Sequence, residues 1–360
     1  MPAFEDAPGL ARTAFGEAMY ARGRELVSRG ILPAHLLWDA DEVLWDWALS
    51  GVRLFSRLPL ALFGNLGHRE YIAVRPGLLE LLWGMHHEAL ARGEDPYLRI
   101  WTSGYPWRLW RILREVEGFD ALLGPPFSRE EGGAAIISNH PRVFTRPDYV
   151  RVMLRLLNHE TRAAQLAPLS PAARATIERQ LVHGVDDSGF KIPELAILDG
   201  KVAFEPARFL IDDARRNVEW FKDAGRSAVH VKSHAPRIFF GKIPNSTWTP
   251  IRFLETTPST LIEAIATALL SLAEDAPTAP RRVAGAAPSE PSRAPQQPAT
   301  RSLGPSSPST QPEPPRRIFH VDIPSEVLWR EWLHPMRELR RAQKRARALL
   351  SSPSDRTGTR

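Results

Sequence analysis

The sequence of 360 residues predicts an α/β fold built on a mostly parallel β-sheet. Short apolar runs alternate along the chain with longer segments of helical periodicity, which is the pattern of repeated strand–helix units. Three of the four predicted strands also run directly into carboxylate or hydroxyl side chains, as expected where the carboxyl ends of parallel strands line a site. The balance of 43% hydrophobic and 24% charged residues is that of a globular domain.

The predicted elements follow the chain in order. The strands are the short apolar runs at residues 35–38, 98–101, 207–211 and 228–231. The helices are expected at residues 77–92, 107–117, 214–224 and 260–273. Between the second and third strands, residues 125–189 contain amphipathic stretches at 148–159 and 171–183, so we expect an inserted subdomain there.

Beyond the α/β domain, residues 276–317 are predicted to be a disordered linker. Pro, Ala, Ser, Arg and Gln dominate this stretch and aromatic residues are absent, so it cannot bury enough apolar surface to offset its ordering entropy. We therefore divide the chain into a domain at 1–275, with the insertion at about 125–189, the linker at 276–317, and a basic amphipathic helical tail at 318–360.

The net charge of +6 belongs to the tail. Residues 316–360 hold eleven Lys/Arg and five Asp/Glu, which is 11 − 5 = +6, so the rest of the chain is neutral. A nucleic-acid groove in the fold is therefore not expected. The tail's apolar stripe, which Pro335 interrupts, favours docking on the main domain or binding to a protein partner, with an acidic surface as the alternative.

Composition also excludes several kinds of site. The chain has no cysteine, so disulfides, thiolate metal sites and thiol nucleophiles are excluded. No apolar run reaches about 18 residues and the first residues lack a signal-peptide pattern, so we expect a cytoplasmic protein without a membrane span. Adjacent His86 and His87 point about 100° apart on a helix and cannot share a zinc ion well, so we expect a solvated helix face there.

Two carboxylates follow the first strand, at Asp39 and Asp41. Side chains at i and i+2 beyond a strand end can face the same cavity. One can act as a nucleophile while the other exchanges a proton with the leaving and entering oxygens. Because two close carboxylates repel each other, a divalent cation such as Mg²⁺ would relieve the repulsion and neutralise a phosphate. The alternative is an acidic cap between strand and loop.

Two further strand ends carry similar chemistry. Thr102 and Ser103 follow the second strand, where hydroxyls and free backbone N–H groups before a helix can seat a phosphate. Asp212 and Asp213 follow the third strand and are suitable ligands for Mg²⁺, although Asp213 could instead cap the next helix.

A cation that balances the phosphoryl charge is expected between the second and third strands. The chain has six Lys, and the first is Lys191. Lys191 opens a helix-like segment 21 residues before Asp212, whereas Lys201 lies 11 residues before it. Both remain candidates, and we favour Lys191.

Together these segments resemble the four motifs of the haloacid dehalogenase-like hydrolases. Residues 39–44, Asp-Ala-Asp-Glu-Val-Leu, are similar to the first motif, an Asp-x-Asp-x-Thr/Val-Leu signature after an apolar strand. Residues 101–103 resemble motif II, Lys191 motif III and residues 210–213 motif IV, in the expected order. The resemblance covers about residues 33–105 and 190–232 and is nearest to the magnesium-dependent phosphatase branch, whose members dephosphorylate phosphotyrosine or small phosphorylated sugars. It implies a Rossmannoid three-layer sandwich.

The resemblance implies a role for each matched residue. Asp39 would attack phosphorus and form an aspartyl-phosphate, while Asp41 would protonate the leaving group and later activate water. Thr102 and Ser103 would bind phosphate oxygens, and Lys191 would offset the charge on Asp39 and on the phosphate.

The implied metal ligands are Asp39, Asp212 and, through its backbone carbonyl, Asp41, with Asp213 either a further ligand or an outer-shell contact through water. The expected cofactor is Mg²⁺, and the expected substrate is a phosphorylated small molecule or a phosphoprotein. Two features depart from the branch. About 85 residues separate motifs II and III, and residues 46–71 are too few for a full helical cap, so we expect a small flap there. A rival hypothesis is a binding module of this fold that recruits a protein or nucleic acid through its basic C-terminal helix.

Overall fold

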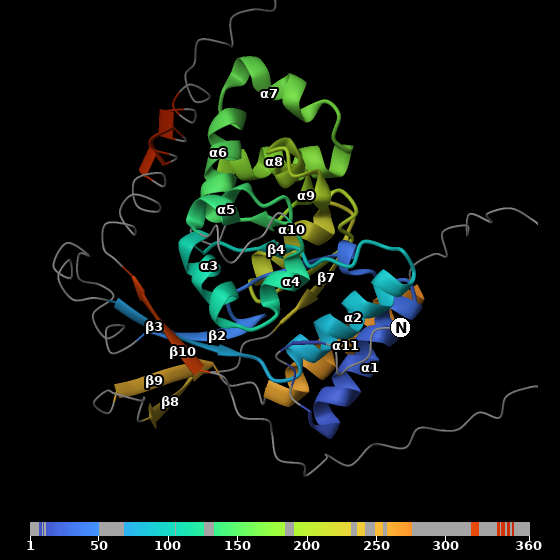
Figure 1. The fold of residues 1–360 in the computed structure, drawn as a ribbon. Helices are drawn as coiled ribbons and strands as arrows, with labels where there is room; N and C mark the ends of the chain where they lie inside the picture. The colour runs from blue at the N-terminus through green and yellow to red at the C-terminus, as the bar shows by residue number, and fades with distance from the viewer. Residues whose placement is uncertain are drawn as a thin grey trace, which may run out of the picture.

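The fold is built around a parallel β-sheet of five strands (Figure 1). The computed structural model describes residues 12–49, 68–104, 106–125, 133–183, 191–231, 236–241, 249–254, 258–275 and 318–323, with residues 7, 8 and 10 and eight residues between 337 and 348. The sheet order is β5-β4-β1-β6-β7, and every neighbouring pair is parallel. The strands are β1 (Leu36–Trp38), β4 (Ile100–Trp101), β5 (Val143–Phe144), β6 (Phe209–Asp212) and β7 (Ser227–His230).

The predicted α/β class and parallel sheet are confirmed. Each predicted strand overlaps β1, β4, β6 or β7, and the predicted helices overlap elements described below. In chain order the strands lie 3-2-1-4-5 across the sheet, so β1 is central. After β1, the chain adds β4 and β5 on one side of it. It then returns to the other side of β1 and adds β6 and β7 there. The carboxyl end of β1 is therefore the point at which the direction of building reverses.

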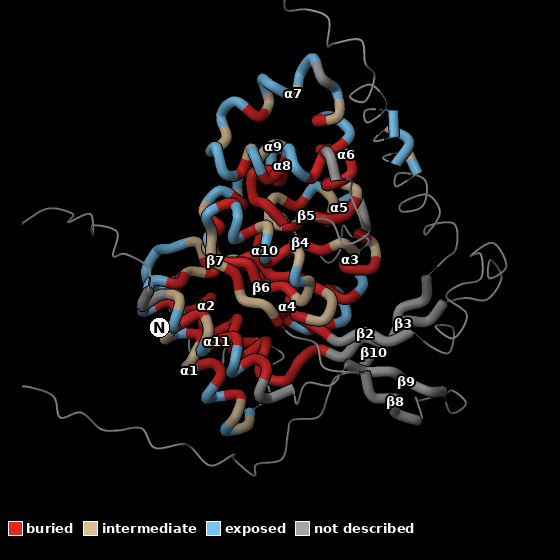
Figure 2. The backbone as a smooth tube through the Cα atoms, turned by 180° about the vertical axis from the view of Figure 1, so that it is seen from behind, coloured by how far each residue is buried: buried red, intermediate tan, exposed pale blue. Residues whose placement is uncertain are grey.

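Alternating side chains divide the core into two layers, one on each face of the sheet. Leu36, Trp38 and Ile211 belong to one apolar cluster, while Leu37 and Leu210 belong to the other. The helices that contribute to the first cluster are α1 (Ala14–Ser28), α2 (Leu78–Ala91), α3 (Pro106–Glu115), α4 (Phe119–Leu123), α5 (Ala134–Asn139) and α11 (Pro258–Asp275). Those of the second are α6 (Arg146–Leu156), α7 (His159–Leu166), α8 (Pro171–His183), α9 (Pro193–Leu198) and α10 (Arg215–Asp223). Figure 2 shows the buried residues concentrated in the sheet between these layers.

Helices α1 and α2 cross so closely that glycine is required on each. A β-carbon on Gly23 would lie 2.1 Å from the Leu81 carbonyl oxygen, and one on Gly84 would lie 2.1 Å from that of Tyr20. The prediction of a solvated face at His86 and His87 was wrong, because α2 is buried nearly all round. His87 Nδ1 lies 2.7 Å from the Tyr20 hydroxyl.

Strand β5 lies within residues 125–189, the stretch that we expected to form a separate subdomain. β5 is the edge strand of the central sheet, and Phe144 packs in the same cluster as residues of α6 and α8. This stretch therefore contributes to the sheet and shares its core. The boundaries of the domain, linker and tail stay predictions, and residues 276–317 lie outside the described residues.

Two small antiparallel sheets accompany the central sheet, and neither was predicted. One has the order β10-β3-β2, from β2 (Trp45–Leu49), β3 (His68–Val74) and β10 (Ile318–Ile323); the other pairs β8 (Pro236–Gly241) with β9 (Thr249–Leu254) (Figure 1). The prediction that the helical tail begins at residue 318 is corrected, because residues 318–323 form strand β10. Their sequence, Ile-Phe-His-Val-Asp-Ile, is rich in β-branched and aromatic residues, which favour a strand. The described residues from 337 to 348 are helical.

Within the described part of the chain, we find no helix long and apolar enough to cross a membrane.

Candidate functional site

The candidate site lies at the carboxyl ends of β1, β4 and β6. Asp39 follows β1 directly, Thr102 follows β4, and Asp212 is the last residue of β6. These strands are neighbours in the sheet. The chain adds β4 and β5 on one side of β1 and β6 and β7 on the other side, which makes this the topological switch point of the sheet. Ligands of open α/β sheets bind at this kind of position, because the loops on either side diverge and leave a crevice.

Three carboxylates converge at these strand ends. One carboxylate oxygen from each of Asp39, Asp212 and Asp213 lies within 4.8 Å of the other two. Asp39 is 6% exposed and Asp212 is fully buried, while Asp213 is half-buried. Backbone contacts fix the position of the pair of strands that carries them, since the Asp39 N–H donates to the Ile211 carbonyl at 3.0 Å. Three predicted metal ligands therefore come together from two strands.

Lys191 joins two of these carboxylates. Its Nζ lies 2.5 Å from Asp39 Oδ1 and 2.5 Å from Asp212 Oδ2, and its side chain is 2% exposed. The residue lies two positions before the short helix α9, which begins at Pro193 after the N-cap residue Ile192. Of the two lysines considered from the sequence, Lys191 is the one whose ammonium group contacts the acidic cluster.

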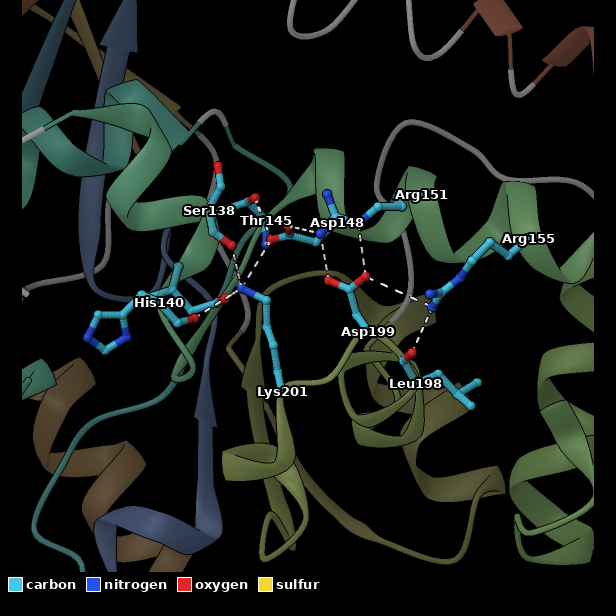
Figure 3. A network of polar contacts seen from close by, with 10 residues as sticks. Ser138, His140, Thr145, Asp148, Arg151, Arg155, Leu198, Asp199 and Lys201 are labelled. Carbon is cyan, nitrogen blue, oxygen red and sulfur yellow. Dashed lines mark hydrogen bonds and ion pairs between the residues drawn. The ribbon is translucent and has the colours of Figure 1, made fainter. Parts of the chain in front are cut away.

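Lys201 binds backbone carbonyl groups in another part of the fold (Figure 3). Its Nζ donates to the backbone carbonyls of Ser138, His140 and Val143 at 2.7, 3.0 and 2.5 Å, and it lies 3.6 Å from Asp148. These groups belong to the segment from α5 to the start of α6. Lys201 therefore fixes edge strand β5, and none of these contacts is with the cluster of Asp39, Asp212 and Asp213.

Burial and mutual repulsion alter the ionisation of the cluster. Burial raises the pKa of Asp39 well above its ordinary range, Asp212 and Asp213 add to the rise, and the Lys191 charge opposes it. Burial, with Asp212 and Glu42 nearby, raises the pKa of Asp213 to about 7. Burial alone would lower the pKa of Lys191, but Asp212 and Asp39 outweigh it and the pKa is raised.

The donor set fits a hard divalent cation. Three carboxylates and one ammonium carry a formal charge of −3 + 1 = −2 when all are ionised. Burial and the neighbouring carboxylates raise the pKa values of both Asp39 and Asp213, so the ionised cluster is unfavourable without a compensating cation. Mg²⁺ prefers oxygen ligands of this kind and would relieve the same repulsion.

Asp212 is the most rigidly held of the carboxylates. Its Oδ1 accepts hydrogen bonds from the Ala214 N–H at 2.8 Å and from Asn217 Nδ2 at 3.1 Å. Asn217, 2% exposed, was not assigned a role from the sequence. The sequence could have indicated this contact, because Asn217 lies five residues after Asp212, on the first turn of the helix that follows.

Thr102 and Ser103 begin the loop after β4. The Thr102 N–H donates to the Phe144 carbonyl at 2.9 Å, and Thr102 Oγ1 accepts from the Gly104 N–H at 2.9 Å. A β-carbon on Gly104 would lie 3.0 Å from Thr102 Oγ1 and 3.7 Å from Asp41 Oδ2. The Thr102 hydroxyl and the Asp41 carboxylate therefore flank the same small space, while Ser103 is half-buried beside it.

The carboxylate of Asp41 lies outside the group of three. Arg108 Nη1 donates to both of its oxygens at 2.8 Å, and Trp45 Nε1 donates to Oδ1 at 3.0 Å. Any part in metal binding would fall to its backbone carbonyl, as the sequence resemblance implies. Arg108 was missed from the sequence. Its signal was its place on the apolar face of α3, four residues before the fully buried Ile112.

The turn between Asp41 and β2 is held from β3. Glu42 has φ of 65°, in the left-handed region that non-glycine residues rarely adopt. The buried Arg75, directly after β3, donates to the carbonyls of Glu42 and Val43 at 2.5 and 3.0 Å. Arg75 thus fixes the loop that follows the second aspartate.

Comparison with protein-family models, with curated proteins and with solved structures finds no match to this chain.

Proposed function

We propose that this protein is a Mg²⁺-dependent phosphatase of the haloacid dehalogenase-like type, which hydrolyses a phosphomonoester through an aspartyl-phosphate on Asp39. The observation that carries the proposal is the buried contact of one lysine with two aspartates from two different strand ends, Lys191 with Asp39 and Asp212. The parallel sheet with a helical layer on each face agrees with the sandwich that the sequence resemblance implies.

In this proposal Asp39 supplies the attacking oxygen. Its Oδ1 is fixed by Lys191 at 2.5 Å and by the Ala40 N–H at 2.8 Å, so the carboxylate is held in one orientation. A carboxylate oxygen of Asp39 forms a bond to phosphorus while the bond from phosphorus to the ester oxygen breaks. Lys191 offsets the negative charge that the phosphoryl group brings beside Asp39.

Asp41 would carry the proton in both halves of the reaction. It gives a proton to the departing ester oxygen, and afterwards takes one from the water that attacks phosphorus and releases Asp39 with inorganic phosphate. Thr102 donates its hydroxyl to a phosphoryl oxygen. Mg²⁺ bound by the aspartates would supply further charge neutralisation for the phosphoryl group.

The substrate would be a phosphorylated small molecule or a phosphoprotein. The Asp41 side chain is 22% exposed, so the leaving-group side of the site is partly open to solvent. Such an opening supports turnover of small aryl phosphates, which makes these compounds suitable first substrates.

The test is hydrolysis of p-nitrophenyl phosphate by the full chain. We expect turnover with Mg²⁺ and none with a chelator, and a loss of about 10³-fold or more in Asp39→Asn. Asp223→Asn is the matched control, because Asp223 is 46% exposed on α10 and touches only Arg179 among the contacts described. Asp39→Asn protein that stays folded and retains wild-type turnover would refute the proposal.

A further inference from the structure

The helical residues near the end of the chain carry a dense set of positive charges. Residues 337–345 hold one acidic side chain, Glu338, and five basic ones: Arg337, Arg340, Arg341, Lys344 and Arg345. The excess of 5 − 1 = +4 falls within nine residues of a chain whose net charge is +6.

These basic residues share one face of the helix and are exposed. At about 100° per residue, the five side chains fall within an arc of about 140° around the helix axis. All five are exposed, and none of the eight described residues between 337 and 348 is buried (Figure 2). The described part of this helix therefore does not pack into an apolar core, and its charged face is open to solvent.

The charge on this face is only weakly compensated within the helix. Arg341 Nη1 donates to Glu338 Oε1 at 2.9 Å, but the two side chains are 69% and 41% exposed, so water and salt screen the pair. Arg340 and Lys344 lie four residues apart, as do Arg341 and Arg345, and like charges at this spacing destabilise a helix. A surface with many negative charges would relieve this repulsion and stabilise the helix.

The apolar residues of the same segment indicate which kind of anionic surface fits. In the sequence, Trp329, Trp332 and Met336 come shortly before the basic face, and Leu339 lies within it. A basic helix combined with Trp and Leu is the pattern of segments that lie in a membrane interface, where cations meet the headgroups and apolar groups enter the acyl boundary. A nucleic acid offers phosphates but no apolar layer for these residues.

We propose that the helical segment at residues 337–348 binds the surface of a bilayer that contains anionic phospholipids. The basic face contacts the negatively charged headgroups, and the protein lies on the surface without spanning it. Because the attraction is electrostatic, it weakens as salt screens the charges. The proposal is independent of the proposed catalytic activity, since no residue of this segment belongs to the candidate site.

The experiment is sedimentation of the full chain with vesicles of phosphatidylcholine, either alone or with phosphatidylserine as about a third of the lipid. We expect binding to the mixed vesicles and none to the neutral ones, with release at about 0.5 M salt. Each basic residue near such a surface changes the partition about fivefold, so Arg340→Gln, Lys344→Gln and Arg345→Gln together should weaken binding about a hundredfold.

The matched control removes three exposed arginines of the α/β domain, with Arg24→Gln, Arg179→Gln and Arg215→Gln, whose side chains are 44%, 50% and 80% exposed. It lowers the net charge by the same amount and should bind as the wild type does. Equal binding to neutral and mixed vesicles, or equal losses in the two triple variants, overturns the proposal. Absence of binding to the mixed vesicles also overturns it, and binding of duplex RNA or DNA in the same buffer would then assign the basic face to a nucleic acid.

Discussion

Asp213 is the residue whose ionisation reports most directly on the pocket. Its pKa is raised to about 7 by burial first and then by the charges of Asp212 and Glu42. A carboxyl group that is hard to ionise in the folded state but ordinary in the unfolded chain makes folding less favourable as pH rises. Mg²⁺ reverses this effect, because it binds the ionised form.

The metal-free protein should therefore lose stability as pH rises from 3.8, the ordinary carboxyl value, to about 7, and lose no more from this group above that. In this window the unfolded chain releases the proton of Asp213 while the folded chain retains it. We expect the melting temperature to fall across the window in a chelator and to recover above pH 7 when Mg²⁺ is added.

Asp213→Asn should flatten the metal-free profile, while Asp223→Asn, on an exposed residue, should leave it as in the wild type. A metal-free melting temperature that rises between pH 5 and pH 7 specifically because Asp213 is present would show that its folded pKa is lowered, contrary to the account.

At this scale the sequence predicts most of the candidate site. Asp39, Thr102 and Asp212 were found because each ends an apolar run, and strand ends in a parallel sheet meet at one edge. Arg108 was missed because the apolar pattern of α3 indicates that its side chain is buried but not that it contacts Asp41. The choice between the two lysines needed the fold, because distance along the chain does not determine which ammonium group contacts Asp39 and Asp212.

At the scale of single elements, edge strand β5 depends on Lys201. The strand has two residues and little pairing of its own, but three backbone carbonyls around it accept hydrogen bonds from one buried ammonium. Strand β5 in turn holds β4, since the N–H groups of Ile100 and Thr102 donate to the carbonyls of Arg142 and Phe144. Lys201 thus acts through strand β5 on strand β4 and on Thr102, which follows it.

Lys201→Met should destabilise the domain by about 3 kcal/mol or more, because a charged donor with several buried acceptors is lost. Amide exchange at Ile100 and Thr102 should accelerate more than exchange in β6. Lys222→Met, on an exposed residue of α10, is the control. If urea denaturation shows the loss of stability but Ile100 and Thr102 exchange no faster than β6, then Lys201 does not act through β5.

Very short strands and contacts between helices that are distant in the sequence could not be predicted from the sequence. Strand β5 is too short to give a period-two pattern, so residues around it were assigned to an insertion. The burial of His86 and His87 depends on the close approach of α1, which two distant glycines permit. Neither feature leaves a signal in the local pattern of polar and apolar residues.

In the whole molecule, a segment from the last part of the sequence pairs with a strand from its first quarter. Strand β10 pairs with β3 over six residues, from Ile318 opposite Ala73 to Ile323 opposite His68. Arg75, just beyond β3, holds the turn after Asp41. A segment near the end of the sequence is therefore part of the structure that supports the candidate site.

Removing residues 318–360 should leave β3 without its outer partner. We expect faster amide exchange in residues 68–73 than in the full chain, with little change in the five-stranded sheet. A chain ending after Ile323 keeps β10 and is the matched control. Equal exchange of residues 68–73 in the two truncated proteins would contradict the pairing.

In the proposed reaction Asp39 becomes covalently phosphorylated at a site that binds Mg²⁺. The most direct measurement is mass spectrometry of the wild-type chain quenched in acid during turnover of p-nitrophenyl phosphate. We expect a phosphoryl adduct on the peptide that contains Asp39, absent when Mg²⁺ is chelated and absent in Asp39→Asn. Steady Mg²⁺-dependent turnover with the adduct on another residue would contradict it.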